Sequence, residues 1–254
     1  MSAGVRVRRE QGIAVITISR PEKRNAFDQG IREGLARALQ THVQDEDCPG
    51  IILTGDGKHF SAGGDVDALA RMSHQELAPL LDAAHRCVTL VREAGKPVLA
   101  AVEGYAAGGA VGLALACDAI VAARDARFVF PFLRIGLVPD WGCVHLLRSK
   151  AGDGAARRLL LRPSDVPGAE ALELGIADML AEPGMACATA MDLMRQYLAL
   201  PAQAWGHTKA MLNAQGLTLA AALEQERQHQ DACFRADAFK PRLAARLKRK
   251  PDAA

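Results

Sequence analysis

The sequence lacks the features that mark several large classes of protein. No apolar run approaches the roughly 18 residues of a membrane-spanning helix. The six cysteines form no Cys-x-x-Cys pair, which argues against a zinc site or a disulfide framework. The N-terminal stretch 5–10 (VRVRRE) is neither a signal peptide nor an acid-poor transit peptide. These absences favour a reduced, cytoplasmic protein.

Common nucleotide-binding and catalytic motifs are missing as well. There is no Gly-x-x-x-x-Gly-Lys-Ser/Thr loop, and the glycines at 104, 108, 109 and 112 do not match Gly-x-Gly-x-x-Gly. His-Glu-x-x-His and Gly-x-Ser-x-Gly are also absent. The net charge of +2 indicates no general attraction to nucleic acid or to a membrane surface.

The most informative stretch that is present covers residues 97–118. An apolar run at 97–102 predicts a short buried strand, and glycines among alanines then lead into a small-residue helix. Glycines at a helix entrance leave backbone N–H groups uncovered, where the helix dipole favours negative charge. This stretch can therefore present an N–H group to a developing oxyanion. Close helix packing explains the same small residues equally well.

A similar order of strand, loop and helix occurs twice earlier in the chain. The first strand is predicted at 12–19, and the helix at 29–40 carries Ile31, Leu35 and Leu39 at helical spacing. Between them, the cationic turn at 20–26 suits either solvent or a phosphate. The second strand, at 51–54, leads into a glycine-rich loop at 55–65, where Asp65 can cap the next helix. A longer helix is expected from about residue 77 to residue 92.

The second half of the chain is predicted to be richer in helix. Two more strands are expected at 119–122 and 128–130, and a turn at 135–142 opens a helix in which Asp140 suits the N-cap position. From residue 154 the pattern is largely helical, with a helix at 168–174 that ends at Gly175 and a short strand at 176–180. Pro201 precedes three helices, predicted at 202–213, 219–234 and 237–250. The basic end of the last helix suits solvent, a phosphate or a neighbouring subunit.

Four motifs occur in one order along the chain: RPEKRNA at 20–26, FSAGGDV at 60–66, GYAAGGA at 104–110 followed by Cys117 and Asp118, and GLVPD at 136–140. With them the sequence resembles the crotonase superfamily, the enoyl-CoA hydratase/isomerase family, over nearly its whole length. The resemblance implies an α/β fold, a spiral of repeated ββα units. It implies an acyl-CoA-binding core over residues 1–200, a helical oligomerisation region over 201–254, and a homotrimer or homohexamer.

The resemblance also implies an acyl-CoA thioester substrate, with no separate cofactor, no metal, no nucleic acid and no membrane partner. The backbone N–H groups of Gly64 and Gly109 match the family's two oxyanion donors, and one such donor is worth roughly 2.7–4 kcal/mol where measured. Positions matched to substrate and coenzyme A contacts are Arg24, Ala62, Asp65, Val66, Phe132 and Trp141.

Two departures from the family pattern concern the reaction. The two glutamates that activate water in the hydratases are replaced by Gly112 and Phe132, which cannot hold or deprotonate water. Asp140 stands where several isomerases of the family carry a catalytic aspartate, and apolar neighbours would raise its pKa and strengthen it as a base. This pattern favours conversion of a 3-enoyl-CoA to a 2-enoyl-CoA. The alternatives are a hydratase-like enzyme, an aryl-CoA enzyme with Asp140 as nucleophile, or a non-catalytic acyl-CoA-binding protein.

Overall fold

The centre of the molecule is a six-stranded sheet. A computed structural model describes residues 4–214 and 216–248. The strands lie in the order β1-β2-β3-β4-β6-β9; β1 pairs antiparallel with β2, and every other neighbouring pair is parallel. Their bounds are β1 Val5–Glu10, β2 Ile13–Ile18, β3 Ile51–Gly55, β4 Val98–Val102, β6 Ala119–Ala123 and β9 Met179–Ala181.

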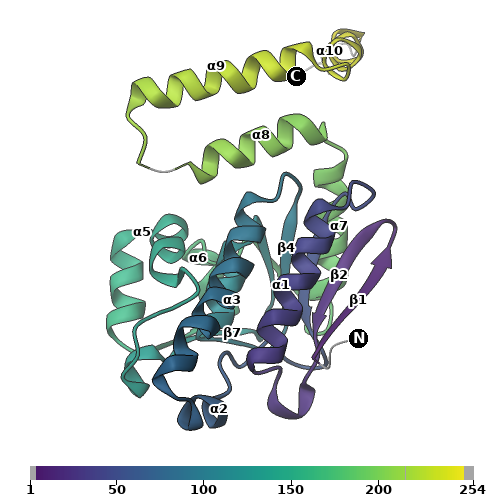
Figure 1. Ribbon diagram of the computed structural model, residues 1–254. Helices are drawn as coiled ribbons and strands as arrows, with labels where there is room; N and C mark the ends of the chain where they lie inside the picture. Colours follow the sequence, from purple (N-terminus) through teal and green to yellow (C-terminus); the bar gives the residue numbers. More distant parts are fainter. Residues whose placement is uncertain (1–3, 215, 249–254) are drawn as a thin grey trace.

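Both faces of this sheet are covered by helices (Figure 1). Helices α1 (Gln29–Gln44) and α3 (His74–Glu93) lie on one face, and α7 (Ala186–Leu198) packs on the other. In β2 the side chains alternate, so that Ile16 belongs to the core under α1 while Val15 packs in the cluster with α7. Such strands bury both faces, which explains their nearly continuous apolar sequences.

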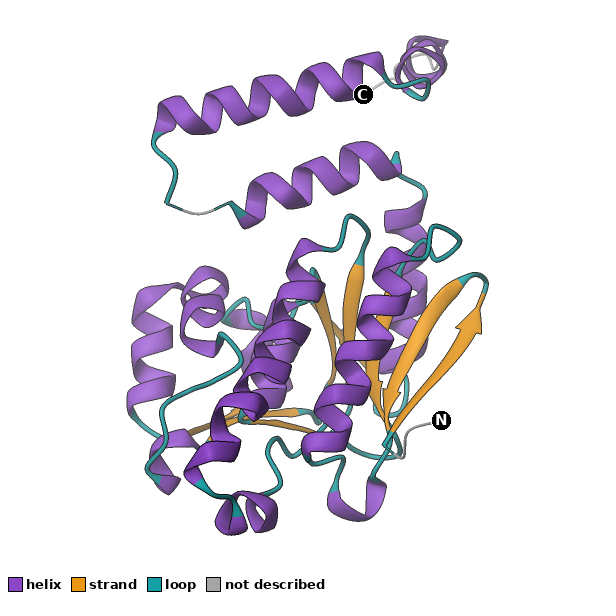
Figure 2. Ribbon diagram, in the orientation of Figure 1, coloured by secondary structure: helices purple, strands orange, loops and turns teal. Residues whose placement is uncertain are grey.

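A smaller sheet lies beside α4 (Gly109–Ala116), and its strands run in another direction (Figure 2). It contains β5 (Tyr105–Ala107), β7 (Arg127–Phe130) and β8 (Ser164–Pro167). The helical expectation after residue 154 was therefore wrong at β8, which is paired antiparallel with β7. All eight residues of α4 are buried. The remaining elements of the body are η1 Pro21–Lys23, α2 Val66–Arg71, η2 Phe132–Ile135, α5 Cys143–Leu161 and α6 Gly168–Glu173.

Three helices extend beyond the body at the C-terminal end (Figure 1). They are α8 (Ala202–Asn213), α9 (Leu219–Arg235) and α10 (Phe239–Lys248). The predicted last helix reached residue 250, and residues 249–250 lie outside the described residues. Neither α9 nor α10 buries any of its described residues.

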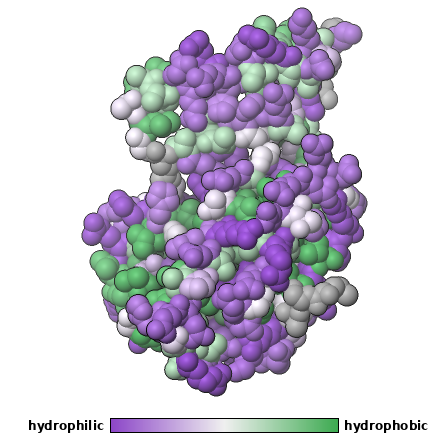
Figure 3. Space-filling model, viewed as in Figure 1, coloured by the Kyte–Doolittle hydropathy of each residue, from purple (hydrophilic) through white to green (hydrophobic). Residues whose placement is uncertain are grey.

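The described helices also include none that is both long enough and apolar enough to cross a membrane. Apolar side chains do reach the surface in places, and green residues gather on the side of the body that carries α5 in Figure 3. The segment that leads into α5 contributes several of the exposed apolar residues of the chain, among them Ile135, Leu137 and Val138.

Candidate active site

The two glycine-rich loops predicted from the sequence lie side by side. Ser61 forms an isolated parallel bridge with Ala106, in which the Ser61 amide donates to the Tyr105 carbonyl at 2.9 Å and the Ala107 amide donates to the Ser61 carbonyl at 3.0 Å. Gly63 has φ +82°, and a Cβ atom there would lie 2.3 Å from the Ala107 carbonyl oxygen. Only glycine permits so close an approach of the two loops.

The amides of Gly64 and Gly109 are left free on these adjoining loops. Phe27 pairs with the residues on either side of Gly64, since its amide donates to Gly63 and its carbonyl accepts from Asp65. Gly109 is the first residue of α4, where an amide has no acceptor within the helix. Neither amide donates a hydrogen bond within residues 4–214 and 216–248. Two unused N–H donors on joined loops are what an oxyanion hole requires, although its formation here stays a prediction.

Asn25 fastens the N-terminal loop to the first glycine loop. It is fully buried at φ +59°, and its side-chain amide donates to the carbonyls of Asp56 (2.9 Å) and His59 (2.6 Å). Its own carbonyl accepts from the Ser61 hydroxyl at 2.7 Å. Sequence reasoning treated Asn25 only as part of a polar turn. Its role is to hold residues 20–27 against the loop that carries Gly64.

Of the three cations in that turn, two are occupied by ion pairs. Arg20 lies 2.8 Å from Asp65 and 3.2 Å from Asp28. Lys23 lies 2.5 Å from Asp67. Arg24 is exposed and forms no ion pair with the described residues, while its carbonyl accepts from the Ala62 amide at 2.8 Å. A contact with phosphate, if the turn makes one, therefore falls to Arg24 beside Ala62.

Asp65 and Val66 take different positions at the start of α2. Asp65 is buried and is the N-cap of the helix, accepting from the amides of Asp67 at 3.0 Å and Ala68 at 3.3 Å. The predicted cap is confirmed. The two amide bonds and the ion pair with Arg20 engage both carboxylate oxygens of Asp65. Val66 is 60% exposed. Val66 and Arg24 therefore lie on the surface, outside the buried group formed by the glycine loops.

Trp141 fills the space beside α4 that two glycines leave open. Its residue is fully buried with φ +52°, and its ring centroid is 5.0 Å from that of Phe27. A Cβ atom at Gly109 would lie 2.4 Å from the indole ring, and one at Gly112 would lie 2.7 Å from the Trp141 carbonyl oxygen. A glutamate at 112 therefore has no room, because backbone as well as side chain occupies the position.

Asp140 lies next to this indole and is not a helix cap. Helix α5 begins at Cys143 with Gly142 as N-cap and no side-chain cap bond, so the capping interpretation of Asp140 was wrong. One carboxylate oxygen of Asp140, Oδ1, is buried without a hydrogen-bond partner. Burial raises the pKa of the Asp140 carboxyl, and the positive charges of Arg32 and His85 partly oppose this.

The sequence analysis missed Arg32, on α1. Its residue is only 2% exposed, and its guanidinium carbon lies 5.9 Å from the centre of the Phe27 ring and 5.4 Å from that of Trp141. Its Nη2 atom is 3.5 Å from where a Cβ on Gly64 would lie. Burial lowers the pKa of Arg32, while the Asp140 charge raises it. A signal was present, because Arg32, Leu35, Ala36 and Leu39 share one helix face.

The structure thus gathers most of the predicted residues around the N-terminus of α4. Phe132 is buried, with its ring 3.9 Å from a Cβ position on Gly108, and it joins Gly64, Gly109, Asp140 and Trp141 there. Two pockets open on neighbouring elements, and none of these five residues lines either one. One of about 340 Å³ is lined by Arg32 and Leu69, and one of about 460 Å³ by Ile135 and Leu69. Cavities of about 580 and 660 Å³ next to α8 involve none of these residues.

Paired glycine loops in front of a small-residue helix, on this sheet with its C-terminal helices, define a protein of the crotonase fold. The sequence profile of enoyl-CoA hydratase/isomerase matches residues 8–252. The chain belongs to the enoyl-CoA hydratase/isomerase family, the crotonase superfamily, and is an acyl-CoA enzyme of that family.

Individual relatives differ in their reactions. The chain is 32% identical to 1,2-epoxyphenylacetyl-CoA isomerase of Escherichia coli strain K12 over 249 residues, 95% of each chain. It is 30% identical to 2,3-dehydroadipyl-CoA hydratase of the same organism over 226 residues, 87% of each chain. A crystal structure of a putative enoyl-CoA hydratase from Streptomyces coelicolor A3(2) has a TM-score of 0.92 at 34% identity, covering 99% of this chain and 94% of the other.

Proposed function

We propose that this protein is an enoyl-CoA isomerase that converts a 3-enoyl-CoA to a 2-enoyl-CoA. The observation that carries the proposal is Asp140, a partly buried carboxylate whose Oδ1 atom is buried without a hydrogen-bond partner. A single base suffices for this reaction, because the proton only moves from one carbon to another. One relative named as an isomerase acts on an enoyl thioester, the trans-2-decenoyl-[acyl-carrier-protein] isomerase of Streptococcus mutans.

In the proposed mechanism, Asp140 removes a proton from the α-carbon of the bound thioester. The electron pair moves onto the thioester oxygen to give a dienolate, and the N–H groups of Gly64 and Gly109 stabilise that oxygen. Fixed N–H dipoles need no reorganisation as the charge develops, which is why such donors are effective. Asp140 then returns the proton to the γ-carbon, and the double bond comes to lie next to the thioester.

Hydration is the less favoured reaction although several relatives are hydratases. Water addition in this family relies on two carboxylates, and this chain has Gly112 and Phe132 in their places. The Trp141 backbone closes the space at 112, so no neighbouring side chain takes over that position. A water held by Asp140 alone lacks the second carboxylate.

A paired absorbance assay tests the proposal. Purified protein is given a 3-enoyl-CoA in one cuvette and a 2-enoyl-CoA in another, and the conjugated thioester is followed by its ultraviolet absorbance. We expect absorbance to rise with the first substrate and to stay nearly constant with the second. Rapid loss of the 2-enoyl-CoA would identify a hydratase, and no change with either substrate would favour a non-catalytic acyl-CoA-binding protein.

The proposal also names the residues that bind the coenzyme A part of the substrate. Arg24 and the loop from Ala62 to Val66 would bind coenzyme A, with Arg24 free for a phosphate.

We also propose that α8–α10 join subunits in a homotrimer or homohexamer. Leu219 and Phe234 are exposed on α9, and none of the residues of that helix is buried. Sedimentation as a monomer at micromolar concentration would contradict this assembly.

A further inference from the structure

Unpartnered buried polar atoms concentrate at one place in this molecule. In the described part of the chain, five buried side-chain nitrogen or oxygen atoms have no hydrogen-bond partner. Four of the five belong to Arg32 (Nε and Nη1), Asp140 (Oδ1) and Trp141 (Nε1). The fifth, on His207, lies in the contact between α8 and α9. Such atoms are rare because each costs free energy, so a group of four requires an explanation.

The thioester oxygen does not provide the missing partner. In the proposed function that oxygen takes the amides of Gly64 and Gly109, which are backbone donors separate from the four atoms. The three nitrogen atoms of Arg32 and Trp141 are donors only. They therefore call for a second acceptor oxygen. The same guanidinium borders the first glycine loop, since Arg32 Nη2 lies 3.5 Å from the Cβ position on Gly64.

The charge of Arg32 indicates whether the second acceptor oxygen belongs to a neutral or to an anionic group. No carboxylate among the described residues lies within 4.0 Å of the guanidinium, and the aromatic rings of Phe27 and Trp141 are its near neighbours. Asp140 interacts with it only over a longer distance. A buried guanidinium without an ion pair favours an anionic partner more than a neutral one.

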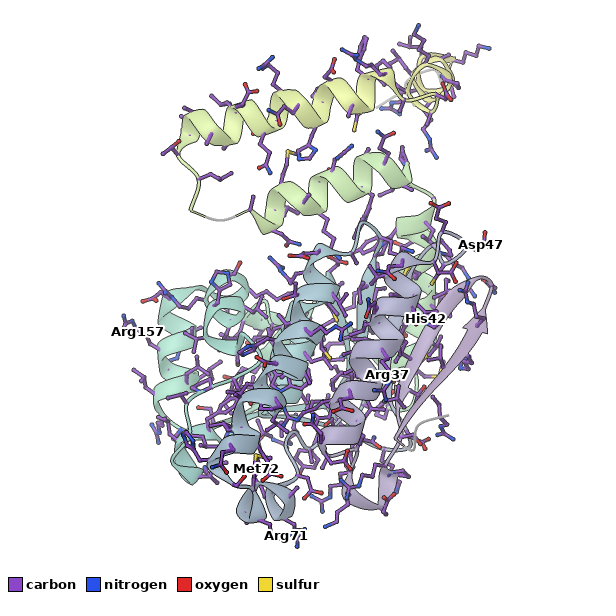
Figure 4. All side chains as sticks on the ribbon, viewed as in Figure 1. Arg37, His42, Asp47, Arg71, Met72 and Arg157 are labelled. Atoms are coloured by element: carbon purple, nitrogen blue, oxygen red, sulfur yellow. The ribbon has the colours of Figure 1, made fainter. Side chains whose placement is uncertain are left out.

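The surroundings of Arg32 are otherwise suited to an acyl chain. Its pocket of about 340 Å³ shares Leu69 and Met72 with the apolar pocket of about 460 Å³ next to it, and Figure 4 shows Met72 at the end of α2. The carboxylates at the rim of Arg32's pocket are already engaged. Asp28 caps α1, Glu76 accepts from Ser73, and Asp65 pairs with Arg20. Arg32 therefore lies in a pocket of mixed lining, which combines apolar side chains such as Leu69 and Leu80 with a second cation, Arg71.

We infer that Arg32 is a specificity-determining residue that binds a second oxygen on the acyl group, and that the preferred substrates are acyl-CoA thioesters carrying a carboxylate a few carbons from the thioester. Trp141 Nε1 is the neighbouring donor for the same oxygen. This inference rests on the proposed function for the reaction, but the binding that it describes does not require turnover. A plain hydrocarbon chain would leave the Arg32 donors unpartnered and would bind more weakly for that reason.

The expected preference in binding can be estimated from sites that distinguish a substrate from an analogue lacking one polar group. A site built to hydrogen-bond a substrate group rejects the analogue that lacks the group by about 10⁴- to 10⁵-fold in the best cases, because its buried polar atoms are left unpaired. We expect a preference below that limit, on the order of 10²-fold in binding.

Three saturated thioesters of nearly equal shape test this preference. They are 4-methylpentanoyl-CoA, 4-oxopentanoyl-CoA and succinyl-CoA, whose acyl groups end in two methyl groups, in a ketone and in a carboxylate. None has a double bond to move, so calorimetric titration of the full-length protein measures binding alone. We expect succinyl-CoA to bind most tightly and 4-methylpentanoyl-CoA least tightly. Equal affinities, or tightest binding of the hydrocarbon, would overturn the inference.

Substitution of Arg32 assigns the preference to that residue. Arg32→Met should abolish the difference among the three thioesters. The matched control is Arg37→Met, because Arg37 is on the same helix but exposed, 3.6 Å from Glu33, as Figure 4 shows on the outer side of α1. A preference that persists in Arg32→Met, or that is lost equally in Arg37→Met, contradicts the assignment. If Arg32→Met does not fold, the wild-type titrations still decide whether the preference exists.

The two proposals fail in different measurements. If no double bond moves in the absorbance assay, the proposed isomerase activity is rejected. The preference for succinyl-CoA measured by calorimetry can still hold, because it needs no turnover. If the protein isomerises a 3-enoyl-CoA but binds the three thioesters equally, the proposed reaction stands. The inferred role of Arg32 in binding a second substrate oxygen is then rejected.

Discussion

Two regions of the molecule bury charged side chains, and they treat them in opposite ways. Lys209 of α8 is buried, and its ammonium group donates to Asp118 (2.8 Å), to the Val91 carbonyl (2.8 Å) and to the Lys96 carbonyl (3.3 Å). Asp118 also accepts from the Val98 amide at 2.8 Å. At the other region, Arg32 Nε and Nη1 and Asp140 Oδ1 are buried atoms with no hydrogen-bond partner among the described residues.

The difference separates a charge pair that is satisfied within the fold from charged groups that keep unused donors and acceptors. Three donors of Lys209 meet three acceptors, so its ammonium group has no unused donor. Arg32 has donors in excess and Asp140 has an unused acceptor. Polar groups that are paired within the fold stabilise it, whereas unpaired ones lower stability and are retained where a bound molecule satisfies them. Four substitutions test the contrast.

Of the four substitutions, Asp140→Asn should have the largest effect, and that effect should be on isomerase activity alone. The amide has nearly the shape of the carboxylate but cannot accept a proton, so isomerisation should fall by about 10²- to 10⁴-fold. Binding of coenzyme A thioesters should change little, because Arg24 and the loop at 62–66 are untouched. Initial rates and calorimetric affinities measure the two quantities. Wild-type turnover in this variant would show that another group is the base.

Lys209→Met should have its effect on stability instead. Removing one partner of a buried ion pair typically costs about 3–5 kcal/mol, because the other charge remains buried. For a chain of this size that corresponds to a fall of about 10 °C in the thermal midpoint. The control is Arg124→Met, since Arg124 forms an exposed ion pair with Glu182 at 2.8 Å and its loss should cost no more than about 1 kcal/mol. Similar thermal midpoints for the two variants would show that the buried Lys209–Asp118 pair stabilises the fold no more than the control pair does.

Gly112→Ala should damage the unpaired site through its backbone. A methyl group there meets the Trp141 carbonyl at 2.7 Å, so residues 140–142 must move away from α4 and carry Asp140 with them. We expect a loss of about 1–3 kcal/mol in stability, typical of overpacking, together with lower activity. Gly154→Ala is the control, because that helical position is open and alanine there should stabilise by about 0.5–1 kcal/mol. Thermal melts that rank the two variants the other way would count against this packing.

The pH dependence should show the smallest effect. Burial raises the pKa of Asp140, and a base works only when deprotonated, so activity should fall on acidification at a pH above the ordinary aspartate value. Arg32 opposes the rise, and Arg32→Gln should therefore move the acidic limb of kcat/KM to higher pH. An acidic limb that stays in place would show that the two groups are not coupled. Arg37→Gln should leave the limb unchanged.

Much of the fold could be predicted because the sequence pattern is locally decisive. The apolar runs gave β2, β3, β4 and β6 to within a residue or two, and Gly175 ends α6 in the left-handed conformation as expected at that place. Strand β1 was missed although its alternation of valine and arginine over residues 5–8 is typical of a half-exposed edge strand. Strand β8, SDVP, is too short and polar to be recognised without its partner β7.

The site was predictable in part for the same reason. Glycines that permit a close approach are visible in a sequence, so the two loops could be located before the fold. What no motif shows is which side chain fills the space that a glycine leaves. The indole of Trp141 against Gly109 and the guanidinium of Arg32 beside Gly64 depend on contacts between distant segments. Arg32 was detectable only as a charge on the apolar face of its helix.

The bridge between Ser61 and Ala106 has a dynamic consequence. Because it ties the two glycine loops to each other and Asn25 ties a third segment to them, none of the three can open alone. The amide hydrogens of Ser61 and Ala107 should therefore exchange with deuterated solvent at the slow rate of the surrounding core and at the same rate as each other. An enzyme built in this way keeps its donors in place between turnovers, and it loses them only when that whole part of the fold unfolds.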